Sequence, residues 1–548
     1  MGGHLPLSST EKVNIFLPLL LALALAGGIW LGFELSNNNK NPNLVLGKLD
    51  EILQFIDARY LENESKNKLE DTAINAILDE LDPHSNYISL DNIEMVNESL
   101  SGNFDGIGIE FFILEDTIFI VGVINKGPSD SAGLMIGDKI IMINDSLVAG
   151  NGIYNKDVVN KLKGLAGSDV TIKIKRMGEE NLIPITITRG QIPMYSVDVA
   201  YMLNETTGLI KINRFSSTTY KEFMVALENL VRNHNMQDLI IDLRHNPGGY
   251  LDAATKILDQ LFTSKQLLVY TEGRSYHRKE YNSTGNSNFD IGKVAILINE
   301  SSASASEIMA GAIQDNDRGI IIGRRSFGKG LVQEQYKLSD GSALRLTVAR
   351  YYTPSGRYIQ KPYDGTEGDY GQDLKHRYES GELSNQDSIH FTDTTIYKTS
   401  SGRIVHGGGG IVPDIFIPID TNILNPYFLV MNSYVRNFVY RYLDQRRHSI
   451  KNEFPDFEKF NKNFNINPLI FKRFIAYLET KNITHNDQLL QNFEKLLKTQ
   501  LKAYIADQIY SKVGMYKTLF KHDPMVLRAI KELKRGQTSV NPSAMNNK

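Results

Sequence analysis

Strands and helices alternate through the middle of the chain, and this order restricts the fold more strongly than any other feature of the sequence. Short apolar runs rich in β-branched residues lie at 208–215, 238–244, 293–299 and 319–323, and the first three are each followed by a helical segment. Consecutive parallel strands need crossover helices of this kind. The order therefore predicts an α/β core built on a mostly parallel sheet.

A different pattern precedes this core. Residues 102–189 contain short strands separated by turn residues, with one helical segment at 155–163, and they predict a small barrel capped by a helix. From about residue 46 to 81, apolar residues follow helical spacing. Asp82-Pro83 ends the second helix of that region, because the residue before a proline disfavours the helical conformation.

The segment 15–33 is 19 residues long and carries no charge. As a helix it would span about 28 Å, close to the thickness of the hydrocarbon core of a bilayer. A cleaved signal peptide is the alternative, since Ala24-Leu25-Ala26 resembles a cleavage site. The apolar run continues past that site, which favours an uncleaved anchor with the body of the chain on one face of the membrane.

Helical periodicity returns after residue 425, and the balance of charge changes there. Residues 421–548 hold 21 lysines and arginines against 10 aspartates and glutamates, whereas the rest of the chain holds 39 against 53. A basic helical domain on an acidic body predicts an anionic partner or an internal docking surface. The last residues, 536–548, have the composition of a disordered tail.

The chain has no cysteine, which excludes disulfides, thiolate zinc sites, iron–sulfur clusters and a cysteine nucleophile. The HExxH, EF-hand and P-loop spacings are also absent. We therefore expect no metal and no other cofactor.

Residues 299–315, NESSASASEIMAGAIQD, predict a turn from a buried strand into a helix. A serine at a helix N-terminus has backbone N–H groups and the positive end of the helix dipole beside it, and such donors can stabilise the oxyanion of acyl transfer. The same residues also fit an ordinary packing turn in which Ser304 and Glu307 form a capping box. The pattern by itself leaves both interpretations open.

Lys329 lies between two glycines and four residues before Gln333, in RRSFGKGLVQEQ (324–335). In a strand, both side chains would point to the same face. A free lysine is a poor base at neutral pH, but burial lowers its pKa, and the neutral amine can then take a proton from a serine hydroxyl. Gln333 could hold that amine without adding a charge. A solvent-exposed or phosphate-binding lysine is the alternative.

The segment DLRHNPGGYLDAA (242–254) predicts a strand that ends in a glycine-rich turn before a helix. The N–H groups of Gly248 and Gly249 could approach a ligand there and supply an oxyanion donor; a plain connecting turn is the alternative. Asp242 and His245 also allow a Ser–His–Asp triad, but nothing in the sequence brings His245 to a serine.

Residues 104–111, FDGIGIEF, predict a loop of exposed N–H groups that leads into a strand edge. Such a loop can bind a terminal carboxylate while the peptide before it adds to the strand. We expect the helix at 155–163 to form the other wall of this groove. The candidate groove residues are Gly106, Ile107, Gly108, Ile109, Val158 and Leu162.

Together these motifs resemble those of the carboxyl-terminal processing (tail-specific) proteases, a family of serine peptidases. LDPHSNYI (81–88) is similar to the family's N-terminal signature, GIGIEF with PSDSAGLMIGDKI to its PDZ domain, and DLRHNPGG to its oxyanion loop. SASASEI, RRSFGKGLVQ, ARYYTPSGRYIQ (349–360) and GIVPDI (410–415) are similar to its catalytic core. The resemblance covers residues 45–420.

The resemblance implies a ClpP/crotonase-like α/β protease core with an inserted PDZ domain. The residues that it carries over by position are the nucleophile Ser304, the general base Lys329, its supporting amide Gln333, and the oxyanion-hole donors Ala305, Gly248 and Gly249. It also implies a metal-free peptidase that cleaves proteins whose non-polar C-terminal tails bind the PDZ domain. His245 stands where the family often has asparagine or aspartate.

The expected layout is a stub and anchor at 1–35, an N-terminal helical region at 36–100, the PDZ domain at 101–190, the protease core at 191–420 with an insertion at 362–403, a basic helical domain at 421–535 and the tail at 536–548. Family members are typically exported, so we expect a single-pass protein of the bacterial inner membrane with its catalytic body in the periplasm. The expected partners are peptide or protein substrates, the membrane through 15–33, and a second copy of the chain or an adaptor, but no nucleic acid.

Two other functions remain open from the sequence. One is a catalytically silent PDZ scaffold or chaperone, against which the intact set of Ser304, Lys329 and Gln333 argues. The other is a crotonase-type enzyme acting on an acyl-CoA thioester, against which the PDZ domain and the anchor argue.

Overall fold

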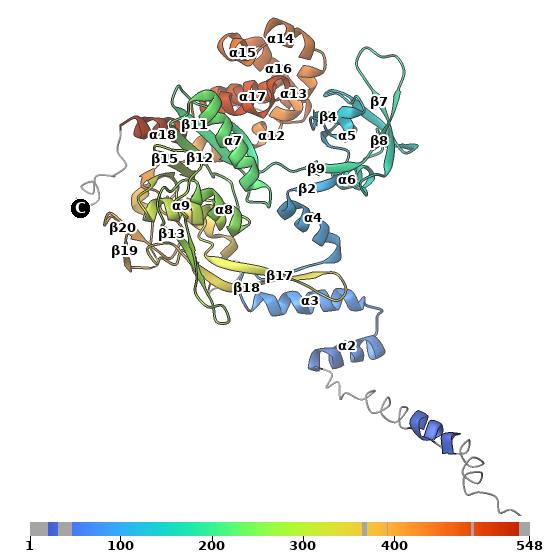
Figure 1. Ribbon diagram of the computed structural model, residues 1–548. Coiled ribbons are helices and arrows are strands. Elements are labelled where there is room, and N and C mark those ends of the chain that lie inside the picture. The colour runs from blue at the N-terminus through green and yellow to red at the C-terminus, as the bar shows by residue number, and fades with distance from the viewer. Residues whose placement is uncertain are drawn as a thin grey trace, which may run out of the picture. The chain divides into compact units, whose positions relative to one another are not determined.

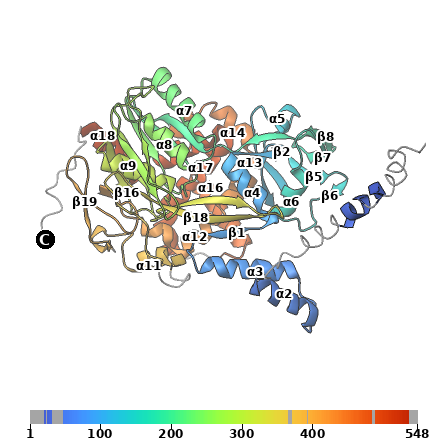
Figure 2. The same ribbon diagram turned by 60° about the horizontal axis from the view of Figure 1, so that its bottom comes forward.

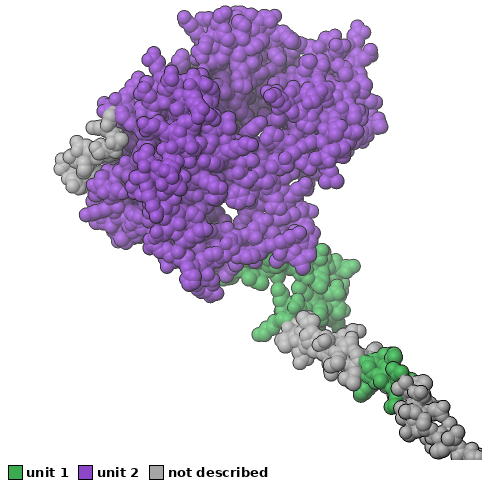
Figure 3. All heavy atoms as spheres, in the orientation of Figure 1, with its two compact units in different colours: residues 1–80 green, residues 81–548 purple. Residues whose placement is uncertain are grey.

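The computed structural model describes residues 20–22, 24–30, 47–363, 370–391, 393–483 and 487–535. The chain divides into two compact units, residues 1–80 and 81–548 (Figure 3). Half of the segment 15–33 and all of the tail 536–548 lie outside the described residues, so the anchor and the disordered tail stay predictions. Within the described ranges, no helix is both long and apolar enough to cross a membrane.

In the first unit, residues 20–22 and 24–30 are helical, and α2 (Lys48–Arg59) and α3 (Lys66–Asp79) contact each other. Each helix buries a single side chain, Leu53 in α2 and Leu78 in α3. α3 ends three residues before the Asp82-Pro83 pair that was expected to stop it.

A six-stranded sheet forms the centre of the second unit (Figure 1). Its strands lie in the order β10-β11-β12-β15-β16-β21, and every neighbouring pair is parallel except β10 with β11. The bounds are β10 Val197–Met202, β11 Thr207–Ile212, β12 Asp238–Asp242, β15 Val294–Ile298, β16 Gly319–Gly323 and β21 Ile415–Phe416. The predicted α/β core is confirmed, whereas its crotonase-like classification stays a prediction.

Helices cover both faces of this sheet, which explains why its strands are apolar on both sides. One face is covered by α7 (Thr219–His234), α8 (Leu251–Asp259) and α9 (Ala305–Asp315). On the other face, α18 (Pro524–Arg535) buries Met525 and Leu533 in one cluster with Leu209 and Ile240. A helix from the basic C-terminal region thus completes the core of the central sheet.

A second sheet is antiparallel and includes the strand that follows Lys329. β18 pairs with β1, β13 and β17, and β13 pairs in turn with β14. The bounds are β1 Asn86–Ile88, β13 Leu267–Glu272, β14 Lys279–Asn282, β17 Leu331–Lys337 and β18 Ala343–Tyr352. β17 and β18 form a long two-stranded ribbon, visible in Figures 1 and 2.

A small β domain is inserted before the central sheet. Its strands lie in the order β3-β4-β5-β7-β8, with β6 paired to β5, and two short strands, β2 and β9, pair where the chain enters and leaves it. The bounds are α4 Leu90–Ser101, β2 Asn103–Gly106, β3 Ile109–Leu114, β4 Thr117–Val123, α5 Pro128–Ser131, β5 Lys139–Ile143, β6 Ser146–Leu147, α6 Asn155–Leu162, β7 Asp169–Lys175, β8 Ile183–Thr188 and β9 Gly190–Pro193. Its core contains Ile118, Ile140 and Ile172.

The basic C-terminal region is helical. Its elements are η2 Thr421–Leu424, α12 Pro426–Ser433, α13 Val435–Asp444, α14 Arg447–Glu453, α15 Phe457–Asn463, α16 Pro468–Thr480 and α17 Asp487–Phe520. Phe438, Phe460, Phe474 and Phe493 belong to its core. α17 is two helices joined at a kink, where Ser511 has φ 69° and ψ 176°.

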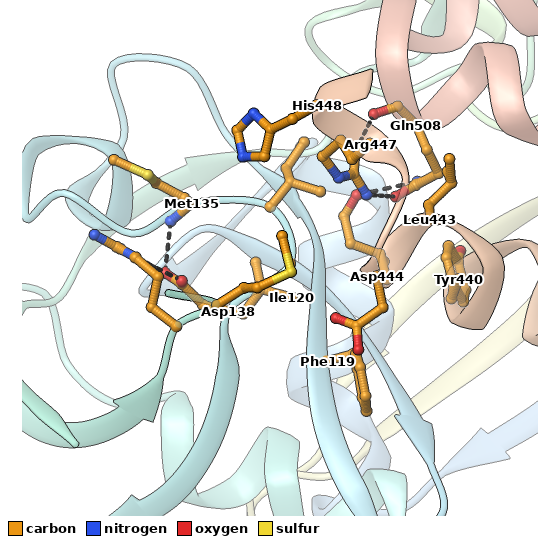
Figure 4. Close-up of a pocket in the computed structure, with 15 residues that line it drawn as sticks. Phe119, Ile120, Met135, Asp138, Tyr440, Leu443, Asp444, Arg447, His448 and Gln508 are labelled. Carbon is orange, nitrogen blue, oxygen red and sulfur yellow. Dashed lines mark hydrogen bonds and ion pairs between the residues drawn. The ribbon is translucent and has the colours of Figure 1, made fainter. Parts of the chain in front are cut away.

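These helices contact the small β domain. A cavity of about 180 Å³ lies between β4 and the loop 135–138 on one side and α13, α14 and α17 on the other (Figure 4). Lys139 Nζ lies 2.9 Å from a carboxylate oxygen of Asp444. Gln508 Nε2 donates to the Val121 carbonyl oxygen at 3.1 Å. The basic region therefore binds both the central sheet, through α18, and the small β domain.

The expected insertion at 362–403 contains α11 (Asp373–Glu379), η1 (Gln386–Ser388) and the hairpin strand β19 (Ile396–Lys398), whose partner β20 (Ile404–His406) follows it. The buried carboxylate of Glu382 pairs with Arg325 at 2.6 Å and with Arg377 at 2.8 Å. These ion pairs fix the segment against the loop that leads to Lys329.

Candidate active site

Ser304 occupies the junction between β15 and α9. Its backbone has φ 55° and ψ −114°, a strained conformation for a residue with a side chain. Two hydrogen bonds fix the turn against the loop after β12: the Ala303 N–H donates to the Asn246 carbonyl at 3.0 Å, and the Ser302 hydroxyl donates to the Leu243 carbonyl at 2.9 Å. Ser304 is therefore held in a strained position at the start of a helix.

The glycine turn after β12 packs directly on Ser304. Gly248 has φ +97°, and a Cβ there would lie 2.7 Å from the Ser304 Cβ and 2.9 Å from the Ala305 nitrogen. A Cβ on Gly249, at φ +137°, would lie 2.1 Å from the Phe215 carbonyl oxygen. Both positions therefore require glycine, for conformation and for space.

The backbone donors that remain free at this junction are those of Ala305 and Gly249. In the part of the chain that the structure describes, neither N–H has an acceptor. The Gly248 N–H, by contrast, donates to Asn246 Oδ1 at 2.8 Å. Of the three expected oxyanion-hole donors, two are thus free and one is engaged within its own loop.

A buried carboxylate joins the serine turn to the lysine loop. Glu307 Oε2 accepts the N–H groups of Ser304 and Lys329, at 2.8 Å each. Its Oε1 accepts the Gly328 N–H at 2.7 Å and the Ser326 hydroxyl at 2.5 Å. Burial raises the pKa of Glu307 to about 7, and these hydrogen bonds oppose the rise. The sequence indicated only the contact with Ser304, as part of a capping box.

Lys329 has the surroundings of a general base. Its Nζ donates to Gln333 Oε1 at 2.8 Å. Burial, followed by the charge of Arg345, lowers the pKa of Lys329 to about 8, while the carboxylates of Asp82 and Glu307 oppose the shift. A larger fraction of this amine is therefore neutral near neutral pH than of a free lysine.

The LDPHS loop holds Gln333 in turn. Gln333 Nε2 donates to the His84 carbonyl oxygen. The buried Asp82 fixes the loop by accepting the His84 N–H at 2.9 Å and the Thr347 hydroxyl at 3.0 Å. Burial, followed by the charge of Lys329, lowers the pKa of His84 to about 4, so this imidazole is neutral. The contact uses a backbone oxygen, which no residue pattern reveals, so the sequence predicts no role for this loop.

The two candidate reacting atoms are not hydrogen-bonded to each other. Among the described residues, no such bond joins Ser304 Oγ to Lys329 Nζ. The segments that carry the two groups are nevertheless joined, because Glu307 binds the backbone of both. Catalytic hydrogen bonds often form only in the substrate complex, so Lys329 stays a candidate base.

The Ser–His–Asp triad finds no support in this geometry. Asp242 Oδ2 lies 2.8 Å from Arg244 Nη2 and 3.6 Å from Lys211 Nζ. Burial would raise the pKa of Asp242, but these two positive charges lower it to about 2. The His245 ring lies beside the Asn299 side chain instead, and its Nε2 is 3.2 Å from Asn299 Nδ2. In the described chain, His245 has no hydrogen bond to Asp242 or to a serine.

Comparisons with known proteins decide the family. The model of peptidase family S41 matches residues 206–371, that of the PDZ domain matches 106–187, and that of a family of unknown function matches 427–511. The chain is 34% identical over 329 residues to the carboxy-terminal-processing protease of Bartonella bacilliformis, covering 59% of this chain and 75% of that protein. The chain belongs to the carboxy-terminal processing proteases. It is an S41 serine protease with a PDZ domain.

Other carboxy-terminal processing proteases give similar matches. The chain is 34% identical over 319 residues to the carboxy-terminal processing protease CtpB of Bacillus subtilis, covering 58% of this chain and 66% of that protein. The structure of the photosystem II D1 C-terminal processing protease is 27% identical, with a TM-score of 0.33, and the match covers 60% of this chain and 91% of that one.

The PDZ domain of this carboxy-terminal processing protease has a loop of free donors after β2. In the described residues, the N–H groups of Ile107 and Gly108 have no acceptor, whereas the Ile107 carbonyl accepts the Ser129 N–H at 3.0 Å. Gly108 has φ +77°, which a glycine adopts without strain. β3 starts one residue later, at Ile109.

Five of the six candidate groove residues are buried, and Ile109 is the exception. Ile107, Val158 and Leu162 are 3%, 0% and 4% exposed and belong to the core of the PDZ domain. Apolar positions at helical spacing marked α6 correctly as a helix that packs on the sheet. They did not identify the side chains that α6 presents to a ligand.

Proposed function

We propose that this protease cleaves peptide bonds with a serine–lysine dyad. Ser304 attacks the scissile carbonyl carbon, and the neutral Lys329 amine takes the hydroxyl proton and returns it to the leaving amine. The N–H groups of Ala305 and Gly249 stabilise the oxyanion, and water then hydrolyses the acyl-enzyme. The observation that carries the proposal is the partly buried Lys329 amine, whose pKa is lowered to about 8 and which Gln333 holds at 2.8 Å.

The dyad is completed when substrate binds. A lysine amine can make more than one hydrogen bond, so Lys329 can keep Gln333 as a partner while it turns toward the Ser304 hydroxyl. Gln333 then orients the amine without a negative charge that would raise its pKa again. In this proposal the described geometry corresponds to a resting state.

Substrates are selected by a non-polar C-terminal tail. The free N–H groups of Ile107 and Gly108 bind the terminal carboxylate. β3 is the last strand of its sheet, so one of its edges can pair with the residues that precede the carboxylate. We further propose that 15–33 anchors the protein in the bacterial inner membrane with this body in the periplasm, because that run is uncharged for 19 residues.

The test is digestion of an unfolded reporter protein by the full-length enzyme in detergent, beside Ser304→Ala and Lys329→Ala. We expect the wild type to cleave a reporter that ends in apolar residues but not the same reporter ending in two aspartates. Both variants should be inactive with unchanged circular dichroism. Cleavage that survives in Lys329→Ala would refute the dyad, and equal cleavage of both reporters would refute recognition of the tail.

A further inference from the structure

The C-terminal helical region contains a cavity of about 540 Å³ between α15 and α17. Its lining carries more positive than negative charge. The charged residues in it are Lys462, Lys495, Lys498, Lys502, Lys521 and Glu494. The cavity is within the size range of small-molecule sites and lies outside the catalytic residues described above.

The fold brings these lysines together from three segments. Lys495, Lys498 and Lys502 follow one another at spacings of three and four residues, so they share one face of α17. The kink in α17 separates this face from Lys521, which follows the helix and nevertheless lines the same cavity. Lys462 comes from α15.

Most of this charge has no counter-charge from the protein. Glu494 pairs with Lys498 at 2.5 Å. Lys502 Nζ donates to the Asn461 carbonyl at 2.8 Å, and burial, followed by the charge of Lys521, lowers the pKa of Lys502. In the described residues, Lys462, Lys495 and Lys521 have no carboxylate within ion-pair distance. Ammonium groups that share a cavity repel one another, and a bound anion would relieve this repulsion.

The uncharged residues of the lining limit the kinds of ligand that the cavity can bind. Asn465 and Gln491 offer amide donors for oxygen atoms, whereas the hydroxyls of Thr499 and Thr518 donate to helix carbonyls, each at 2.8 Å. The lining holds one aromatic ring, the imidazole of His522, and one apolar side chain, Ile466, so an acyl chain finds little apolar surface to bind. Lysines act as point charges that suit phosphate oxygens, whereas the planar recognition of a carboxylate favours arginine.

We propose that this cavity binds a hydrophilic ligand that carries two or more phosphate groups. The groups belong either to a soluble polyphosphorylated molecule or to the headgroup of a phospholipid. The site is separate from proteolysis, and its occupancy does not depend on the serine–lysine mechanism.

The test is isothermal titration of the full-length protein with inorganic tripolyphosphate at low ionic strength. The double variant Lys495→Gln/Lys521→Gln removes two of the unpaired charges, and Lys472→Gln/Lys531→Gln removes two exposed lysines that lie outside the cavity. We expect saturable binding that weakens at least tenfold in the first double variant and less than twofold in the second. No binding, or equal weakening in both, would overturn the proposal.

A competition experiment distinguishes the two sources of phosphate. A short-chain cardiolipin, whose headgroup carries two phosphates, is kept below its micelle-forming concentration and displaces tripolyphosphate if the natural ligand is a lipid headgroup. If the lipid leaves the titration unchanged while tripolyphosphate binds, the ligand is a soluble polyphosphate.

Discussion

Gly248→Ala should disable the protease, because the glycine turn packs against Ser304, the proposed nucleophile. The new Cβ would lie 2.7 Å from both the Ser304 Cβ and the Ala303 carbonyl oxygen. Non-bonded carbon atoms prefer a separation of about 3.5 Å or more, so the serine turn must move by about 0.8 Å. A misplacement of about 1 Å costs roughly 100-fold in rate. We therefore expect kcat/KM for a quenched fluorescent peptide to fall about 100-fold.

Gly402→Ala is the matched control. Gly402 has φ +88°, close to the value at Gly248, but no atom lies within 4 Å of a Cβ built there. Both alanines carry the strain of a positive φ, about 1–2 kcal/mol, which thermal unfolding would report. Only Gly248→Ala also collides with the nucleophile. If kcat/KM of Gly248→Ala stays within threefold of that of Gly402→Ala, the predicted displacement of Ser304 is refuted.

Three further predictions concern the lysine loop and the PDZ domain. Glu307→Gln puts an NH2 donor where a carboxylate oxygen accepts the N–H groups of Ser304 and Lys329. The free energy of unfolding, measured with urea at pH 8, should therefore fall by about 2–4 kcal/mol. An unchanged urea midpoint would contradict this. Asp82→Asn removes a charge that raises the pKa of Lys329, the proposed base, so the acid limb of kcat/KM against pH should move to lower pH. Ser85→Ala removes a hydrogen bond to Asp82 but no charge, so an equal shift there would refute an electrostatic cause. Asp444→Lys places a second positive charge beside Lys139, so amide hydrogen exchange should rise in β5 of the PDZ domain. Unchanged exchange would show that the contact between Lys139 and Asp444 does not restrain β5.

The strands of the central sheet could be predicted because helices cover both of its faces. Ile240 and Ile241 point to opposite sides of β12, and both are fully buried. The role of α18 could not be predicted in the same way. An amphipathic helix reveals that it has an apolar face, but its sequence does not say which surface that face covers.

Spacing and family resemblance predict roles for Ser304, Lys329 and Gln333. The structure shows the contact between Lys329 and Gln333, and the catalytic roles stay predictions. The remaining contacts of the site join distant segments. Glu307 binds a loop some twenty residues further along the chain, and His84 contributes a carbonyl oxygen to Gln333 across 249 positions. Neither contact leaves a periodic or local signal in the sequence.

The most direct test of the central claim is the pH dependence of Ser304 modification by a fluorophosphonate. With Lys329 as the base, the modification rate of the wild type should rise through a single ionisation near pH 8, and Lys329→Ala should slow it at least 100-fold at that pH. A rate in Lys329→Ala that stays close to that of the wild type, and that rises through an ionisation near pH 6.5 as a histidine would give, would contradict the serine–lysine mechanism.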